Sequence, residues 1–196
     1  MTEIRWDKLL RIRTSGRDDS HSDQYHYPYE PTPYSVLERL GNSGYIGKKN
    51  TLLDYGAGKG RVGFFLAYQT RCRCIGLEYD ERIYRAAVAN KEKAVSSMRV
   101  DHIHTRAEEY EIPPGVDRLY FFNPFSVEIL QKVIGKVRSS WYEAPRELLL
   151  FFYYPSDEYI SWLMTVEEMQ FTDEIDCRDL FEGENKRVRI LIFEMV

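Results

Sequence analysis

The sequence has few cysteines and histidines, no excess of positive charge and no long apolar run, and each absence excludes a class of protein. Its three cysteines lack the paired spacing of a structural zinc site, and two of its four histidines, His102 and His104, alternate on a probable strand without acidic or cysteine companions, so we predict no metal site. Lys and Arg total 27 against 31 Asp and Glu. The resulting net charge of -4 argues against a surface built wholly for nucleic acid, although a local basic patch stays open.

Membrane and secretory classes are excluded in the same way. No stretch approaches the ~18 apolar residues of a membrane span, and the first residues, MTEIRWDKLLRIR, lack the apolar core of a secretory signal. We therefore expect a cytoplasmic protein without a membrane partner.

The 196 residues, 43% of them hydrophobic, suffice for one well-buried core rich in aromatic rings. Residues 1–30 are polar and predict an N-terminal arm or lid, of a composition typical of a loosely held tail. Residues 31–196 form the predicted domain. The tyrosines of the first part either wall a substrate pocket or pack a segment onto the body: Tyr25, Tyr27, Tyr29 and Tyr34.

Beyond residue 31, strand-like and helix-like patterns alternate. Strands are predicted at residues 51–55, 74–79, 100–105, 116–122, 147–154, 171–177 and 187–196. Helices are predicted after the cap residue Thr32, after the glycine turn, from Asp80 to residue 97, after Ser126 and after Ser156. The alternation predicts an α/β fold with a doubly wound, mostly parallel seven-stranded sheet and helices on both faces. The last two strands are separated by a short polar loop, so we expect the sheet to end in an antiparallel hairpin.

A glycine-rich turn, DYGAGKG, follows the first predicted strand. A dinucleotide site would need a glycine where Arg61 stands, and a phosphate-binding P-loop would need Ser or Thr where Gly60 stands. The arrangement D-x-G-x-G-x-G, from Asp54 to Gly60, instead resembles the first motif of the class I S-adenosylmethionine-dependent methyltransferases. The order of the other elements and the final hairpin are similar to that family from residue 31 onward.

The resemblance implies S-adenosylmethionine as the cofactor and a set of residues that hold it. Glu78 ends the second predicted strand, where the family has an acid on the ribose hydroxyls, and Asp54 and Thr32 correspond to positions at the methionine end. The family's Gly-Asp-Ala is replaced by Thr105, Arg106 and Ala107, so adenine recognition is left to backbone groups, stacking or Glu108. The cofactor-binding residues predicted in this way are Thr32, Asp54, Gly56, Ala57, Gly58, Gly60, Glu78, Tyr79, Ala107 and Asn123.

The fourth predicted strand ends in Asn123, Pro124 and Phe125, which resemble, with one proline fewer, a motif of methyltransferases that act on amino groups. There the amide oxygen and a carbonyl accept the N–H bonds of the acceptor, and the aromatic ring stacks on it. The resemblance implies that these three residues are catalytic. Alternatively, the asparagine and proline start the next helix and the phenylalanine joins the core.

The predicted activity is methyl transfer from S-adenosylmethionine, with an amino nitrogen favoured. Oxygen or carbon methylation by the same fold, and a non-catalytic cofactor-binding module, are the alternatives. The acceptor is open among a small molecule, RNA and a protein side chain; the net charge does not indicate nucleic acid, and the sequence does not predict the oligomeric state.

Overall fold

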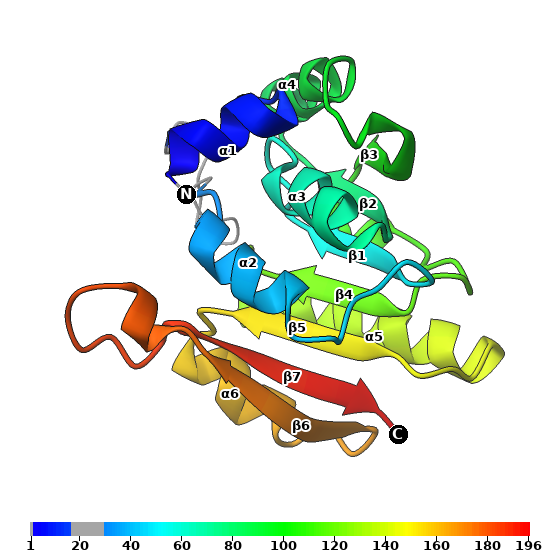
Figure 1. Ribbon diagram of the computed structural model, residues 1–196. Coiled ribbons are helices and arrows are strands. Elements are labelled where there is room, and N and C mark those ends of the chain that lie inside the picture. Colours follow the sequence, from blue (N-terminus) through cyan, green and yellow to red (C-terminus); the bar gives the residue numbers. More distant parts are fainter. Residues whose placement is uncertain (1, 17–29) are drawn as a thin grey trace.

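The computed structural model describes residues 2–16 and 30–196, arranged around one seven-stranded sheet (Figure 1). The strands are β1 (Thr51–Tyr55), β2 (Arg73–Glu78), β3 (Val100–His104), β4 (Arg118–Phe121), β5 (Leu149–Tyr153), β6 (Met169–Asp176) and β7 (Arg189–Met195). Their order is β3-β2-β1-β4-β5-β7-β6. The first five run parallel, and β7 is antiparallel to both β5 and β6. The predicted fold class, with its closing hairpin, is confirmed.

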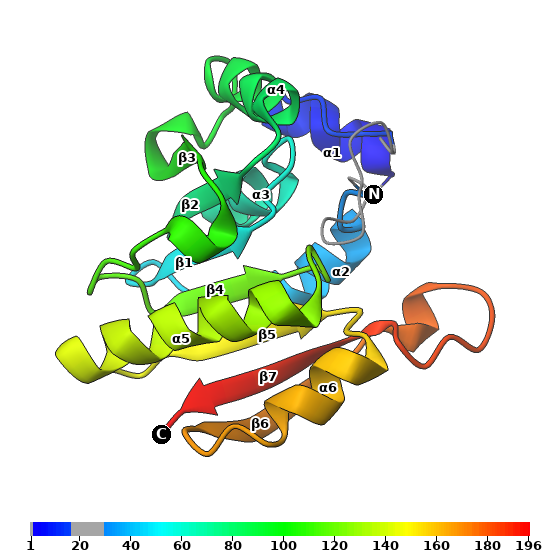
Figure 2. The same ribbon diagram turned by 180° about the vertical axis from the view of Figure 1, so that it is seen from behind.

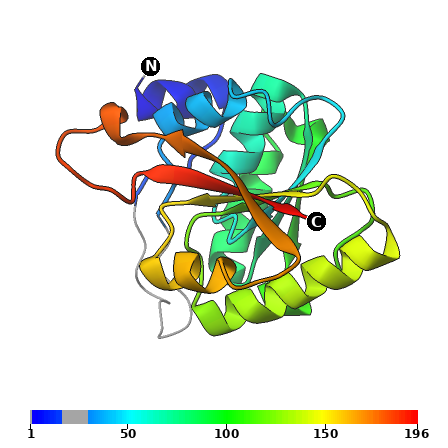
Figure 3. The ribbon, with the colours of Figure 1, turned by 90° about the horizontal axis from the view of Figure 1, so that it is seen from below.

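The helices form two layers over this sheet. They are α1 (Glu3–Leu10), α2 (Tyr34–Gly41), α3 (Arg61–Thr70), α4 (Glu81–Lys91), α5 (Val127–Glu143) and α6 (Asp157–Leu163), with 3₁₀ turns at Ser97–Arg99, Ala107–Glu109 and Arg178–Leu180. Figure 2 shows α5 and α6 on one face, and Figure 3 shows them opposite α1, α2 and α3. Helix α4 packs against β2 and β3.

Aromatic rings tie the central strands together. Tyr55 of β1 stacks on Phe121 of β4 with ring centroids 4.7 Å apart, and Phe121 stacks on Phe152 of β5 at 4.6 Å. All three rings are buried. Parallel strands buried on both faces require such continuous apolar runs, and the ladder fixes the strand ends on which the functional groups lie.

The N-terminal residues differ from the predicted loose tail. Residues 3–10 form helix α1, and Trp6, Leu10 and Ile12 are buried in the same core as α2 and α3. Trp6 contacts the ring of Phe65 edge-on at 4.9 Å. These apolar residues, spaced for one helix face, outweigh the polar composition of the segment, so residues 2–16 are part of the domain's packed body.

Two helix boundaries also differ from the sequence prediction. The helix predicted to residue 97 ends at Lys91, because the chain then turns inward to bury Ala94 and to donate the Val95 N–H to the carbonyl of Leu10. Helix α2 begins at Tyr34 with Pro33 as its cap residue. Thr32 does not cap it, because its hydroxyl pairs with the hydroxyl of Tyr120 at 3.0 Å. Ser156 does cap α6, as predicted, by accepting from the Tyr159 N–H.

No helix within residues 2–16 and 30–196 is long and apolar enough to cross a membrane.

Candidate functional site

A pocket lies where the carboxyl ends of β1, β2 and β4 meet, the edge at which open α/β sheets bind ligands. We call it the central pocket. Its walls come from the segment before α2, the glycine turn, the ends of the three strands, the turn after β3 and the start of α5. The lining residues include Glu30, Pro31, Thr32, Asp54, Gly56, Ala57, Arg61, Leu77, Glu78, Tyr79, Ile83, Thr105, Ala107, Glu108, Phe122, Asn123, Pro124 and Phe125.

The backbone of the glycine turn leaves little room for side chains. Gly56, Gly58 and Gly60 all have positive φ, at 72°, 57° and 89°. A Cβ on Gly56 would lie 2.8 Å from Cβ of Pro124, and one on Gly60 would lie 2.5 Å from Nε2 of His102. Only Gly56 and Ala57 of the turn line the pocket. Gly58 and Gly60 therefore shape the turn from behind, and direct contact of these two glycines with a cofactor stays a prediction.

Glu78 is held at the end of β2 by the turn that it faces. Its Oε2 accepts from the Gly58 N–H at 3.0 Å, and its Oε1 accepts from the Asp80 N–H at 2.9 Å. Burial raises the pKa of Glu78, although these N–H groups work in the opposite direction. The Tyr79 N–H also acts on this carboxylate, and because a carboxylate has about four acceptor positions, the side chain keeps acceptor capacity for a ligand hydroxyl.

Asp54, in β1, is the second buried acid of the pocket. It is 2% exposed, and its Oδ2 has no hydrogen-bond partner among the described residues. Burial, with the charge of Glu78 adding to it, raises the pKa of Asp54 to about 8. Two acids in one desolvated pocket favour a ligand that brings positive charge and hydrogen-bond donors.

Asn123 lies two residues beyond β4 and has a left-handed backbone, with φ of 42°. Asparagine tolerates this region better than most residues. Its Oδ1 is buried and has no hydrogen-bond partner among the residues described, while the residue lines the pocket. The alternative of a helix cap is wrong, because α5 begins at Val127 with Ser126 as its cap residue. A buried acceptor without a partner costs about 1–3 kcal/mol, which a ligand donor would recover.

Pro124 and Phe125 have different surroundings. Pro124 packs directly over Gly56, which locks the segment to the glycine turn. Phe125 is 3% exposed and sits edge-on to Tyr55 and Phe121, with centroids 6.3 Å away in each case. Its ring is thus a core side chain that contributes only to the pocket wall.

The aromatic surface at this end of the pocket comes from a residue that the sequence prediction did not include. Phe122 is half-buried, lines the pocket, and lies 4.7 Å from the ring of Tyr153. The strand pattern placed Phe122 inside the apolar run, so nothing in the sequence separated it from its buried neighbours. Phe122 is therefore better placed than Phe125 to stack on an acceptor.

The far end of the pocket holds the residues predicted for adenine. Tyr79, Thr105 and Ala107 line it, whereas Arg106 is exposed and does not. Glu108 also lines it, and its Oε2 is buried without a hydrogen-bond partner in the described part of the chain. An acid is therefore present at this end, two residues later than the family pattern has it.

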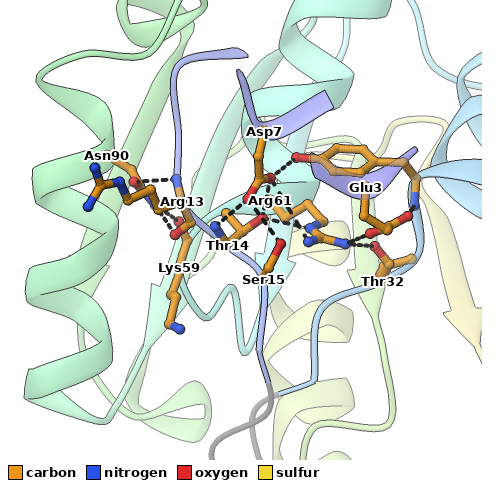
Figure 4. Close-up of polar contacts among 10 residues, drawn as sticks. Glu3, Asp7, Arg13, Thr14, Ser15, Thr32, Lys59, Arg61 and Asn90 are labelled. Atoms are coloured by element: carbon orange, nitrogen blue, oxygen red, sulfur yellow. Dashed lines mark hydrogen bonds and ion pairs between the residues drawn. The ribbon is translucent and has the colours of Figure 1, made fainter. Parts of the chain in front are cut away.

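Arg61 is the main pocket residue that the sequence prediction missed. It is 3% exposed, and its Nη1 donates to the carbonyl of Thr32 at 3.2 Å and also bonds the carboxylate of Glu3. Its Nε donates to the hydroxyl of Thr14 at 2.7 Å. Figure 4 shows this guanidinium between the glycine-turn helix and the N-terminal segment. Arg61 thereby fixes the position of Thr32 at the pocket wall.

Tyr34, predicted as a possible pocket wall, is instead buried, and its hydroxyl donates to Asp7 at 2.6 Å. Tyr25, Tyr27 and Tyr29 lie outside the described residues. Within the described ranges, no cluster of three or more His, Cys, Asp or Glu side chains is arranged to hold a metal ion.

No protein family model matches the chain, and no curated protein matches it in sequence. Many solved structures share its fold. An RNA methyltransferase from Salinibacter ruber in complex with S-adenosyl-L-homocysteine is 19% identical, with a TM-score of 0.57 over 85% of this chain and 94% of that one. A dimethyladenosine transferase from Plasmodium falciparum is 14% identical, with a TM-score of 0.57 over 85% and 63% of the two chains.

The similarity extends to methyltransferases of a different chemistry. The mitomycin 7-O-methyltransferase is 12% identical, with a TM-score of 0.62 over 82% of this chain and 53% of that one. At these identities the likeness concerns the fold. The chain therefore has the Rossmann-like α/β fold of the S-adenosylmethionine-dependent methyltransferases.

Proposed function

We propose that the chain is an S-adenosylmethionine-dependent methyltransferase that acts on an amino nitrogen. The observation on which this proposal depends is the central pocket itself, in which Asp54, Glu78 and the unbonded amide oxygen of Asn123 line one space beside the glycine turn.

The pocket's own residues match the parts of such a cofactor. Glu78 would accept from the ribose hydroxyls with its free lone pairs, and Glu108 from the adenine amino group. Asp54 and Thr32, which also line the pocket, would hold the amino acid part of the cofactor. When bound, the cofactor supplies a methyl group on a positively charged sulfur, so the protein needs no strong base to activate the acceptor.

The role of Asn123 is to orient the acceptor. Its Oδ1 would accept one N–H of an amino group, which leaves the nitrogen lone pair directed at the methyl carbon. Phe122 would lie against a planar acceptor. Methylation would leave the amino group with a surplus proton, which would pass to solvent.

Calorimetric titration with S-adenosylmethionine and S-adenosylhomocysteine tests the cofactor part of the proposal. Binding of both is expected, with Glu78→Gln weakening both through the lost ribose contact. Absence of heat and of a thermal shift with either ligand, in a folded protein, would leave the chain as a non-catalytic relative.

The acceptor part is tested with Asn123→Ala, assayed by transfer of a labelled methyl group to metabolite and RNA pools. We expect a loss of turnover of about 10-fold or more with S-adenosylhomocysteine affinity nearly unchanged, because the amide oxygen contributes to acceptor orientation alone. Nearly intact turnover in the variant would favour an oxygen or carbon acceptor instead.

A further inference from the structure

A second cleft lies between α1 and α4 and adjoins the central pocket. Asp7 lines this cleft, Arg61 lines the pocket, and Nη2 of Arg61 is 3.9 Å from Oδ1 of Asp7. The two spaces are therefore separated by a single pair of side chains. Four cationic residues surround the second cleft: Lys8, Arg11, Arg13 and Lys93. We call these four residues and the space between them the basic cleft.

The four cations have no anionic partner within residues 2–16 and 30–196. All four side chains are exposed, and among the described residues neither an ion pair nor a side-chain hydrogen bond holds any of them. Some basic side chains elsewhere in the fold do have an acidic partner, as Arg39 has Asp179 and Lys91 has Asp101. Four unpaired positive charges gathered in one cleft of a chain with net charge -4 repel one another, and a polyanion would relieve that repulsion.

The acid in the cleft lining does not neutralise these charges. The Oδ2 of Asp7 accepts from the Thr14 N–H at 2.8 Å, and its Oδ1 accepts from the hydroxyls of Thr14 and Tyr34. Although burial opposes ionisation, these hydrogen bonds and the charge of Arg61 keep the pKa of Asp7 below its usual value. The carboxylate is thus engaged with the core side of the cleft, where its charge is balanced by Arg61.

We propose that the basic cleft binds the phosphodiester backbone of a nucleic-acid strand. We also propose that the same strand presents the methyl acceptor to Asn123, and this second part rests on the proposed function. The cations lie on α1, on the segment after it and just beyond the end of α4, so they are spread along a surface and do not converge on one point. Repeating phosphates match that spread better than a single phosphate does, because a single phosphate requires convergent and more buried donors.

The cleft is mechanically joined to the glycine turn. Asn90 of α4 accepts from the Arg13 N–H at 2.9 Å, and its own amide donates to the carbonyls of Arg13 and Lys59. Figure 4 shows Asn90 in contact with both segments. A strand bound along Arg13 and Lys93 is consequently held in a fixed relation to the turn beside the reacting groups.

The test is fluorescence anisotropy of a labelled 20-nucleotide RNA, and of the DNA of the same sequence, across a salt series. The variant K8A/R11A/R13A/K93A is expected to bind RNA at least about 10-fold more weakly near 0.1 M salt. Its plot of log affinity against log salt should be shallower by about 3, the value for four lost single-strand phosphate contacts. The matched control is K48A/K49A/K132A/K186A, which removes four exposed cations outside the cleft and should retain both the affinity and the slope.

Three outcomes would overturn the proposal: unchanged RNA binding by the cleft variant, equal losses in the control, or cleft-dependent binding of polyglutamate or phosphatidylserine vesicles that matches that of RNA. Comparison of the RNA and DNA arms shows which nucleic acid supplies the phosphates. Calorimetry of the same variants with S-adenosylhomocysteine reports the fold and the cofactor site separately. Strand binding with no cofactor binding would therefore retain the cleft and reject the methyltransferase.

Discussion

Asp54 and Glu78 put two carboxyl groups into one buried pocket, and the two are not equivalent. Glu78 has a backbone N–H on each oxygen, whereas Oδ2 of Asp54 has no partner among the described residues. Burial, and next the charge of Glu78, raises the pKa of Asp54 to about 8, so it is mostly protonated at neutral pH. The folded-state pKa lies above the usual 3.8, so Asp54 makes its full contribution to the free energy of unfolding below pH 3.8. This contribution is lost as the pH rises through 8.

This asymmetry predicts that binding of S-adenosylmethionine releases protons at pH 7. The sulfonium and ammonium charges favour the ionised form of Asp54 and lower its pKa. Calorimetry in buffers of different ionisation enthalpy should report the release of up to about one proton, with affinity rising between pH 6 and 8. Asp54→Asn should remove the buffer dependence; equal apparent enthalpies in all buffers for the unaltered protein would contradict the idea.

At the scale of elements, α1 is attached to the glycine-turn helix by Arg61. The guanidinium bonds Glu3, Thr14 and the Thr32 carbonyl, and it lies 4.4 Å above the Tyr34 ring. A fully buried arginine with several donors engaged cannot be replaced by lysine, whose ammonium lacks the planar fork. One side chain therefore joins α1, the pocket wall and α3.

We predict that Arg61→Met lowers the free energy of unfolding by about 3–5 kcal/mol, because it leaves Asp7 as a buried charge without its cation. Arg61→Lys should recover only part of this loss. Urea denaturation measures the change, and hydrogen exchange should show that α1 loses most protection. The control is Arg39→Met, since Arg39 forms an exposed pair with Asp179 and should cost about 0–1 kcal/mol. Equal losses in the two variants would refute this attachment.

The sequence predicted the elements of the sheet better than it predicted what joins them. The strand of residues 51–55 was predicted to the residue, because local apolar pattern and flanking turn residues determine it. The role of Arg61 could not be predicted in this way, since its partners Glu3 and Thr32 are distant in the chain. For the same reason, composition alone predicts a loosely held tail for the polar first residues, although α1 buries Trp6 and Leu10.

Site residues follow the same division. Glu78 and Asn123 both line the pocket, because each lies at or just beyond the carboxyl end of a recognisable strand; their roles toward a ligand stay predictions. Phe122 and Phe125 are both aromatic and nearly adjacent, and only tertiary packing decides that Phe125 turns into the core. Residue type and spacing thus predict which strand end provides a group, and packing decides which side chain reaches the ligand.

For the molecule as a whole, the pocket and the basic cleft are neighbouring spaces whose linings meet at the pair of Asp7 and Arg61. The chain's net charge is -4, yet unpaired cations gather at the cleft and buried acids gather in the pocket. This separation gives a cationic cofactor and an anionic strand different places to bind, so the two ligands need not compete. The glycine turn lines the pocket with Gly56 and Ala57, is joined to the cleft by the bond from Asn90 to the Lys59 carbonyl, and rests on His102 of β3.

His102 predicts how stability of the whole molecule responds to acid. Burial, and next the charge of Lys91, lowers the pKa of His102 to about 4, and neither ring nitrogen has a hydrogen-bond partner in the described residues. Since an unfolded histidine titrates near 6.5, the unfolded chain binds the extra proton between pH 6.5 and 4. The free energy of unfolding should therefore fall across that interval by up to about 3 kcal/mol.

Urea unfolding of the protein and of His102→Leu, at several values between pH 4.5 and 7.5, measures this contribution as the difference between the two curves. Leucine fills a similar space without a titrating nitrogen, so the variant should lose less stability on acidification. His104→Leu is the matched control, because His104 is exposed on the same strand and its replacement leaves His102 in place. An identical acid response in the His102 variant and the unaltered protein would mean that the imidazole beneath the glycine turn is not buried as a neutral group.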